Sequence, residues 1–394
     1  MEIIKRVILS LLFLVLLEDS FYTDMALNVV LGLLAGIIGL IYIWVKKRFT
    51  YWSDRGVVQV PPVFPFGNIS GVGYKVHLSS VTQHIYNEYK KQASMVGLYF
   101  FIAPVILALD LELIKHILVK DFNYFHDRGI YANAKTDPLS AHLFAIEGAE
   151  WKNMRAKLTP TFTSGKMKMM FGTVVDISVK MIEHMNEEVK KTELEMKDLL
   201  AQFTTDVIGN VAFGLEMNSM KDPNSMFRKM GRKVFETPPL RTMKVIFLAT
   251  FKKFAVKLGL KITQPDVSEF FLKSIRETVD YREANDIQRN DFMNLLLQIK
   301  NKGKINDDTG ASIGTLSFNE LAAQCFLFFL AGFETSSTTM TFALYELALN
   351  PDIQEKLRDE IKAVLKKHDN KLTYEAMLDI KYLQMVIDGN KSSQ

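Results

Sequence analysis

Apolar positions recur with helical spacing along most of the chain, after two continuous apolar runs near its start. Side chains three and four residues apart share one face of a helix, so this spacing predicts amphipathic helices. The predicted helices cover residues 167–191, 197–215, 266–283 and 290–300. Residues 96–109 are instead rich in β-formers and are interrupted by Pro104, which predicts short strands. Residues 301–315 are mostly polar and contain three glycines, so we expect an exposed loop there.

The second apolar run, residues 26–45, carries no charge. As a helix it would be about 30 Å long, which is enough to cross the hydrocarbon core of a bilayer. Lys46, Lys47 and Arg48 follow directly, and positive charge is retained on the cytosolic side of a membrane. We therefore predict a single N-terminal transmembrane helix, with the rest of the chain on the cytosolic face. A buried core helix is the alternative, and the lack of any charge argues against it.

The first apolar run, residues 7–17, is too short to span a bilayer. Basic residues precede it and acidic residues follow it, so it resembles the core of a signal peptide. Met25 lies immediately before the longer run. We therefore expect residues 1–24 to be an artefactual or alternative extension, and residues 25–48 to form the anchor with its basic stop.

Two further segments have compositions that suit a position near a membrane. Residues 61–68 contain three prolines, which fix the backbone and remove donors, so residues 49–75 are predicted to be a stiff, extended tether. An ordinary loop fits the same residues. Residues 237–259 interleave apolar side chains with lysines, which suits a shallow contact with lipid. A buried pair of helices is the alternative for that segment.

Composition excludes several classes of function. The net charge of +4 over 394 residues gives no sign of the concentrated basic face that nucleic-acid binding needs. The sole cysteine, Cys325, cannot form a disulfide within the chain. The seven histidines show no paired ligand spacing, so we expect no zinc site built by the protein alone.

A long helix is expected after the polar loop. Ser317 and Glu320 are spaced as a capping box, in which each side chain accepts from the backbone N–H of the other residue. The helix can then run to Asn350, because Pro351 favours the start of a new helix. The first half of this helix is apolar on nearly every side, which predicts that it is buried.

The pattern breaks in the middle of this helix, at residues 331–339. A glycine such as Gly332 costs about 1 kcal/mol relative to alanine in a helix, and the five hydroxyl side chains that follow compete for backbone hydrogen bonds. Glu334 would need a partner if it were buried. Departures from local rules concentrate at functional sites. A seam of small residues between packed helices is the alternative.

The order Ala-Gly-Phe-Glu-Thr-Ser from Ala331 resembles the oxygen-binding groove of the cytochrome P450 family. A second match begins at Glu150 and places Trp151 and Arg155 four residues apart, on one helix face. Further segments resemble the insect microsomal branch of that family and occur in the expected order. They are residues 122–129, 157–164, 279–283 and 289–292. The resemblance covers residues 25–388, and the catalytic domain is expected over residues 76–388.

The resemblance implies a cytochrome P450 fold and a haem b cofactor. Thr335 would turn its hydroxyl from the carbonyl of Ala331 toward dioxygen, and Glu334 would relay protons from solvent. Gly332 would leave room for a flat ligand to approach the backbone. Thr335 and Glu334 are therefore the predicted catalytic residues. The backbone of Ala331 and Gly332 is predicted to contact the cofactor.

The resemblance also implies the remaining cofactor contacts, the activity and the partners. The indole N–H of Trp151 and the guanidinium of Arg155 would bind a haem propionate. The implied reaction inserts one oxygen atom from dioxygen into a lipophilic small molecule, with electrons from an NADPH-dependent cytochrome P450 reductase. Cytochrome b5 is a second candidate partner. The implied localisation is the endoplasmic reticulum membrane, and the usual role of this branch in insects is detoxification.

Two signatures of the family are absent from these residues. An E-x-x-R pair is expected just after residues 382–388, where residues 389–394 read Gly-Asn-Lys-Ser-Ser-Gln, and no loop with a haem-ligating cysteine follows. Cys325 lies about 15 Å along the helix from Thr335 and on another face, so we do not propose it as the axial ligand. We therefore expect the C-terminal part of the fold to be missing. The alternative function is a truncated, catalytically inactive form.

Overall fold

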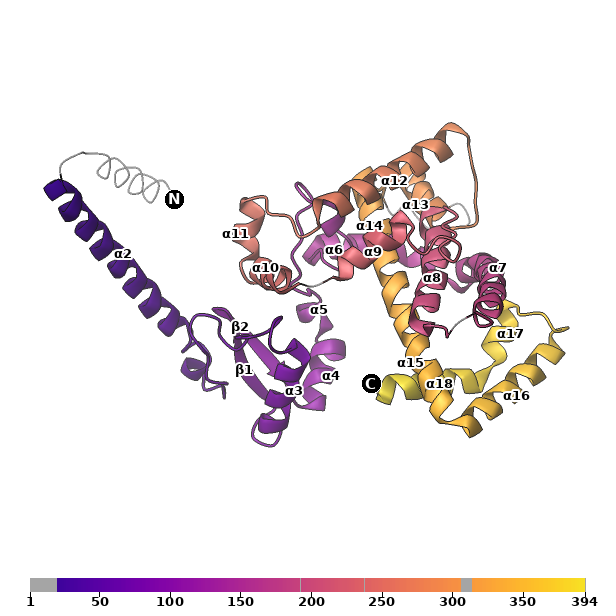
Figure 1. Ribbon diagram of the computed structural model, residues 1–394, viewed down its shortest axis with the longest axis horizontal. Coiled ribbons are helices and arrows are strands. Elements are labelled where there is room, and N and C mark those ends of the chain that lie inside the picture. The colour runs from indigo at the N-terminus through magenta and orange to yellow at the C-terminus, as the bar shows by residue number, and fades with distance from the viewer. Residues whose placement is uncertain (1–19, 192, 237, 306–313, 394) are drawn as a thin grey trace. The chain divides into compact units, whose positions relative to one another are not determined.

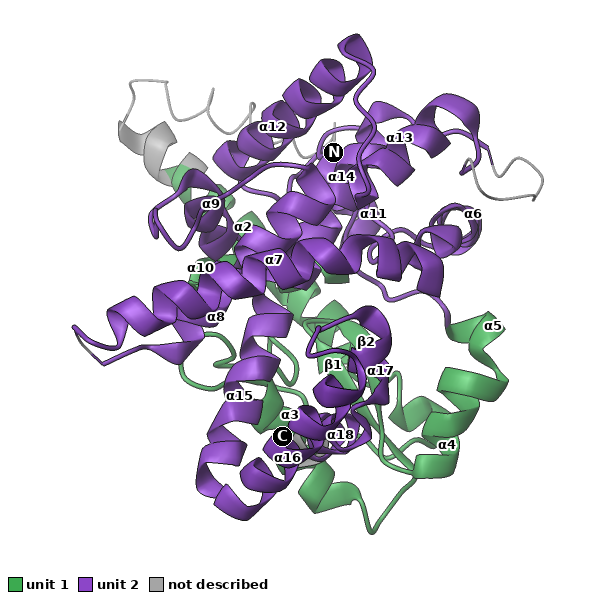
Figure 2. Cartoon of the chain, turned by 90° about the vertical axis from the view of Figure 1, so that its right-hand side faces the viewer, with its two compact units in different colours: residues 1–125, 238–250 green, residues 126–237, 251–394 purple. Residues whose placement is uncertain are grey.

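The computed structural model describes residues 20–191, 193–236, 238–305 and 314–393 (Figure 1). These residues form two compact units (Figure 2). Unit 1 contains the described residues up to 125 together with residues 238–250, and unit 2 contains the others. Most of the expected extension, residues 1–24, lies outside the described residues, so that prediction stays untested.

Unit 1 contains the long apolar helix, one hairpin and several short helices. The apolar helix is α2 (Ser20–Arg48), and its three last residues are basic, as the sequence predicts. The other elements are η1 (Ser53–Arg55), α3 (Leu78–Tyr89), β1 (Met95–Phe100), β2 (Ala103–Ala108), α4 (Leu111–Lys115), η2 (His116–Lys120), α5 (Phe122–Phe125) and α10 (Pro239–Thr250).

The hairpin of unit 1 separates two apolar clusters. β1 and β2 pair antiparallel, and neighbouring residues of a strand point to opposite faces. On one face lies the α3 cluster, which consists of Ile85, Val96, Leu98 and Leu109. On the other face lies the anchor cluster, which consists of Val45, Phe49, Trp52 and Tyr99. The anchor cluster packs the C-terminal end of α2, and the turn that follows it, against the hairpin.

The proline-containing segment is not extended throughout, which corrects the sequence-based expectation. Val63 and Gly67 exchange two backbone hydrogen bonds of 2.9 and 2.7 Å, which close a turn. Asn68 then lies along β1, where its N–H donates to Tyr99 O and its side-chain oxygen accepts from Tyr99 N, both at 2.8 Å. The edge of β1 that is not paired with β2 provides these partners, and a local reading of the prolines cannot anticipate them.

Unit 2 is built from helices. Its elements are η3 (Pro138–Ser140), α6 (Gly148–Leu158), η4 (Thr159–Phe162), α7 (Ser164–Glu188), α8 (Met196–Ile208), η5 (Gly209–Phe213), α9 (Met226–Phe235), α11 (Lys252–Lys257), α12 (Pro265–Ala284), α13 (Phe292–Lys302), α14 (Phe318–Leu330), η6 (Ala331–Thr335), α15 (Ser336–Leu349), α16 (Pro351–Lys367), α17 (Tyr374–Asp379) and α18 (Lys381–Ser393). The prediction of a mainly α protein with a small β region is confirmed.

α14 contributes the central side chains of the core of unit 2, where it contacts α8, α12, α13 and η3. Phe329 of α14 is fully buried and stacks on Phe333, with ring centroids 5.7 Å apart. Phe271 of α12 contacts Phe329 with centroids 4.9 Å apart. Both hydrogen bonds of the capping box between Ser317 and Glu320 are present. The predicted start and the predicted burial of this helix are therefore confirmed.

A buried ion pair joins α12 to the start of α13. Arg282 donates two hydrogen bonds, of 2.9 and 2.6 Å, to the two carboxylate oxygens of Asp291, and both side chains are almost fully buried. Asp291 also caps α13 by accepting from Asn294 N. Gly214 lies against this pair with a left-handed backbone, φ of 67°, and a Cβ there would meet Arg282 Nη2 at 1.7 Å. The helical stretch predicted over residues 197–215 ends at this left-handed glycine, and the guanidinium leaves no room for a side chain there.

Two predicted segments are described only in part or divided between the units. Of the polar loop at residues 301–315, residues 306–313 lie outside the described residues. The described part of the segment predicted over residues 237–259 contains α10 in unit 1 and α11 in unit 2. Leu248 and Ala255 are buried, whereas Leu240 is exposed. A shallow lipid contact by this segment stays a prediction.

Candidate functional site

The polar break in the long helix is a π turn. α14 continues without interruption into η6 (Ala331–Thr335) and then into α15, so the helical run does reach the residues before Pro351. Within it, the Thr335 hydroxyl donates to the carbonyl of Ala331, as expected. The Ser337 hydroxyl donates to the carbonyl of Phe333 at 3.0 Å. π turns inside α-helices occur frequently at functional sites, and the sequence reading missed this one.

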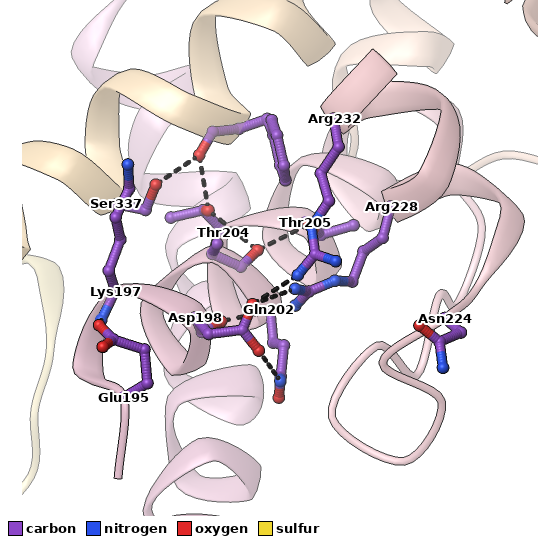
Figure 3. Close-up of polar contacts among 12 residues, drawn as sticks. Glu195, Lys197, Asp198, Gln202, Thr204, Thr205, Asn224, Arg228, Arg232 and Ser337 are labelled. Atoms are coloured by element: carbon purple, nitrogen blue, oxygen red, sulfur yellow. Dashed lines mark hydrogen bonds and ion pairs between the residues drawn. The ribbon is translucent and has the colours of Figure 1, made fainter. Parts of the chain in front are cut away.

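One face of the π turn is packed against α8 (Figure 3). Thr204 of α8 donates its hydroxyl to the carbonyl of Phe333 at 2.8 Å, and both groups are buried. A Cβ at Gly332 would meet Ile208 Cδ1 at 2.8 Å. The space left by this glycine is therefore used by α8, which gives it a packing role. Its predicted contact with a cofactor stays a prediction.

The opposite face of the π turn is open. Ala331 and Thr335 are exposed, and the neighbouring Ser336 is exposed as well. Glu334 is half-buried, and its carboxylate lies 3.2 Å from Lys197 Nζ of α8. Glu334 thus finds its ion-pair partner in Lys197, which lies 137 residues earlier in the chain. No local sequence pattern indicates this pair.

A charged network holds α9 against α8 beside this turn (Figure 3). Asp198 Oδ1 accepts from Arg228 at 2.6 Å and from Arg232 at 2.5 Å, and Asp198 Oδ2 accepts from Gln202 at 2.9 Å. Burial is the largest single influence on Asp198 and acts to raise its pKa. The charges of Arg228 and Arg232, together with the hydrogen bonds that the carboxylate accepts, outweigh burial, so the pKa is lowered. Ion pairs of this network thereby connect α8 to α9, and α8 also contacts the π turn.

The predicted propionate-binding pair lies on α6. Trp151 stacks on His126, with ring centroids 5.4 Å apart and an interplanar angle of 28°. Arg155 is exposed one helical turn later. The loop before α6 is joined to α14 by a hydrogen bond of 3.0 Å from Leu143 N to Gln324 Oε1. The two halves of the predicted cofactor site therefore belong to one unit, and their joint contact with a haem stays a prediction.

Comparisons with known proteins agree with the motifs. Residues 58–388 match the family described as Cytochrome P450. Cytochrome P450 6A1 of Musca domestica is 44% identical over 361 residues, which are 91% of this chain and 69% of that protein. Cytochrome P450 6a2 of Drosophila melanogaster is 43% identical over 364 residues, which are 91% of this chain and 72% of that protein.

The chain belongs to the cytochrome P450 family. The predicted family, and its insect branch, are confirmed by these relatives. The family implies haem-dependent monooxygenase chemistry. The motifs at Ala331 and Trp151 that carried the prediction lie inside the matched residues.

The residues of this P450 chain do not fit one requirement of its cofactor, which is a thiolate ligand. Cys325 is fully buried in the phenylalanine-rich core, and burial raises the pKa of its thiol far above neutral pH. A buried neutral thiol behaves as a small apolar side chain. Since this is the sole cysteine, these 394 residues provide no thiolate for haem iron.

Proposed function

We propose that this chain carries the oxygen side and the propionate side of the active site of a membrane-bound, haem-dependent monooxygenase that acts on lipophilic small molecules. The single observation that supports this most is the π turn. It presents Ala331 and Thr335 on an open face, while its other face is packed against α8. A turn with one packed and one open face suits a site against which a flat cofactor lies.

The proposed roles follow from the groups on that face. Thr335 has a hydroxyl that can exchange the Ala331 carbonyl for another acceptor, and Glu334 can pass protons between solvent and that hydroxyl. Trp151 and Arg155 offer only donors, which suits a propionate. Haem would supply the oxygen-activating chemistry when it is bound with a thiolate.

The electron donor and the localisation are also part of the proposal. α2 is long and apolar enough to span a bilayer, and almost none of its apolar part is buried. If α2 spans the bilayer, Lys46, Lys47 and Arg48 favour a cytosolic position for the rest of the chain, and the proposed membrane is that of the endoplasmic reticulum. NADPH-dependent cytochrome P450 reductase, with cytochrome b5 as a second candidate, would reach it there. Detoxification is the role proposed by analogy.

A second candidate function is supported by Cys325. Because the thiol is buried and protonated, we propose that these 394 residues alone are catalytically inactive, although they keep surfaces for haem contact. The two proposals make separate predictions. The first concerns whether haem binds through Trp151 and Arg155, and the second concerns how its iron is ligated.

The two proposals are tested by titrating haem into the purified chain and recording the Soret absorbance and the reduced carbon monoxide difference spectrum. We expect Arg155→Ala to weaken haem binding about tenfold or more, since hydrogen bonds to charged groups contribute about 1.5–3 kcal/mol. Arg358→Ala, an exposed arginine on α16, is the matched control and should leave the affinity unchanged. We also expect no thiolate-type carbon monoxide band, and no effect of Cys325→Ala on the spectrum.

Equal affinities for the chain, the Arg155 variant and the control would remove the support for the proposed haem contact. A thiolate-type band that Cys325→Ala abolishes would instead overturn the second proposal and leave the first intact.

A further inference from the structure

Residues 126–128 read His-Asp-Arg and have no role in the proposed function, although they lie in a segment that resembles the insect branch of the family. They are the first residues of unit 2 and precede the loop that leads to α6, the helix of Trp151 and Arg155. The structure brings the first two of these residues back onto α6. Their contacts there involve a side chain that is proposed to bind a haem propionate.

The imidazole of His126 stacks on the indole of Trp151. The ring centroids lie 5.4 Å apart, and the two planes are inclined by 28°. The side chain of His126 is only 15% exposed, so its ring is largely enclosed. Aromatic rings favour offset stacks of this kind, and an indole that is covered on one face has fewer orientations open to it. His126 therefore restricts the direction in which the indole N–H points.

Asp127 fixes the orientation of this imidazole. His126 Nδ1 lies 2.7 Å from Asp127 Oδ1. The hydrogen bond from Gly148 N acts most strongly on the pKa of Asp127 and lowers it, burial opposes this, and the contact with His126 lowers the pKa further. The carboxylate is therefore ionised at neutral pH. Since an ionised carboxylate only accepts hydrogen bonds, the imidazole carries a proton on Nδ1 and donates it.

The same carboxylate holds the start of α6. Gly148 is the first residue of this helix, and the N-cap residue Glu147 makes no side-chain capping hydrogen bond. Asp127 Oδ1 supplies an acceptor instead, and Gly148 N donates to it at 2.7 Å. The carboxylate of Glu147 lies 2.7 Å from Lys252 Nζ of α11. One carboxylate thus joins the imidazole to the helix whose indole that imidazole covers.

We propose that His126 is a positioning residue of the haem site, which holds the indole of Trp151 in the orientation that lets its N–H donate to a propionate. The inference rests on the proposed binding of haem by Trp151 and Arg155. Arg155 is exposed, and an exposed side chain loses rotamer freedom when it binds a ligand. The indole is oriented beforehand by its neighbours, and a donor held in this way positions its ligand more precisely.

Fluorine NMR of the chain without haem tests the stack. The chain contains three tryptophans, so labelling with 5-fluorotryptophan gives three signals, and Trp151→Phe identifies the one from position 151. We expect His126→Ala to shift this signal, because a stacked ring changes the magnetic environment of its neighbour. His84→Ala, which removes an exposed histidine of α3, is the matched control and should leave the signal unchanged. A Trp151 signal that His126→Ala does not move would overturn the proposal.

Haem titration tests the effect of the stack on binding. We expect His126→Ala to weaken haem binding about twofold to tenfold, as the loss of one aromatic pair predicts. In the Trp151→Phe background the same substitution should have little further effect, because it acts through the indole. In the Arg155→Ala background it should weaken binding as much as in the unchanged chain. His126→Phe, which keeps a ring at this position, should bind haem nearly as tightly as the unchanged chain.

An equal loss of affinity on His126→Ala with and without the indole would show that His126 acts on the fold and not through Trp151, and would overturn the proposal. Full affinity of the His126→Ala variant would also overturn it if Trp151→Phe and Arg155→Ala weaken binding, and the proposed haem contact would then stand. Unchanged affinity on Trp151→Phe and Arg155→Ala would instead overturn the proposed haem contact itself, and this inference with it.

Discussion

Single side chains define what the π turn can do. Thr335 keeps its hydroxyl on the Ala331 carbonyl, and Glu334 keeps its carboxylate near Lys197. The Thr335 hydroxyl and the Glu334 carboxylate can each exchange this partner for another while the helix stays folded. The buried side of the turn is different, because the Phe333 carbonyl accepts from Thr204 and has no access to water. Side chains on the open face of the π turn can therefore change hydrogen-bond partners, whereas the contacts of the packed face are fixed.

Gly332→Ala tests the packed face. The new methyl group would meet Ile208 at 2.8 Å, and overpacking of this kind costs about 1–3 kcal/mol. The better helix propensity of alanine offsets about 1 kcal/mol of this cost, so we expect a net loss of up to about 2 kcal/mol. It is followed through the fluorescence of Trp151 during urea unfolding, since the other two tryptophans lie in unit 1. Adding Ile208→Val removes the closest atom and should recover part of the loss. Strict additivity of the two changes would show that the glycine and Ile208 do not interact.

His142 gives unit 2 a defined dependence on pH. Burial lowers the pKa of His142 to about 4, from about 6.5 for a free histidine. Between these values the unfolded chain binds a proton that the folded chain excludes, so the free energy of unfolding falls as the pH falls. The expected loss is at most about 1.4 kcal/mol per pH unit.

Urea unfolding between pH 6.5 and 5 measures this slope. His142→Gln should flatten it, whereas His84→Gln, which replaces an exposed histidine, should not. A slope that survives in the His142 variant would mean that another group is responsible.

Helices were the elements easiest to anticipate. α7, α12 and α13 follow the predicted ranges, because apolar side chains three and four residues apart are visible in the sequence. Their ends depended on other parts of the chain. The run that begins at α8 stops at the left-handed Gly214, where the Arg282 guanidinium, 68 residues away, occupies the space that a side chain would need. The proline segment after α2 was predicted to be extended. It forms a closed turn between Val63 and Gly67, and the residue after this turn pairs with the edge of β1.

Gly214→Ala tests how far the α12–α13 junction depends on that close approach. A methyl group would meet Arg282 Nη2 at 1.7 Å and would require a left-handed backbone. Breaking a buried ion pair costs about 3–5 kcal/mol, so we expect a loss of that size, measured by urea unfolding of the full chain. Gly172→Ala is the matched control. Its added methyl group meets no atom within 4 Å in α7, so it should stabilise by about 1 kcal/mol. Equal effects of the two substitutions would contradict the account given for Gly214.

The whole molecule consists of two compact units with different tasks. Unit 1 joins the apolar helix α2 to a hairpin through the anchor cluster. Unit 2 surrounds α14 with helices and carries the π turn, α6 and the charged network of Asp198. The thiol of Cys325 is part of that core and is not placed for chemistry. The proposed activity therefore depends on a thiolate from outside these 394 residues.

Local patterns were enough to recognise the family, the long apolar helix, the capping box and most other helices, because each depends on residues within a few positions of one another. The open and packed faces of the π turn, the Lys197–Glu334 pair and the contact of Phe64 with Tyr42 were decided by packing. Such contacts join residues that are distant in the chain, and the direction in which a helix faces its neighbours is set by the shapes of both. No spacing along one segment contains that information.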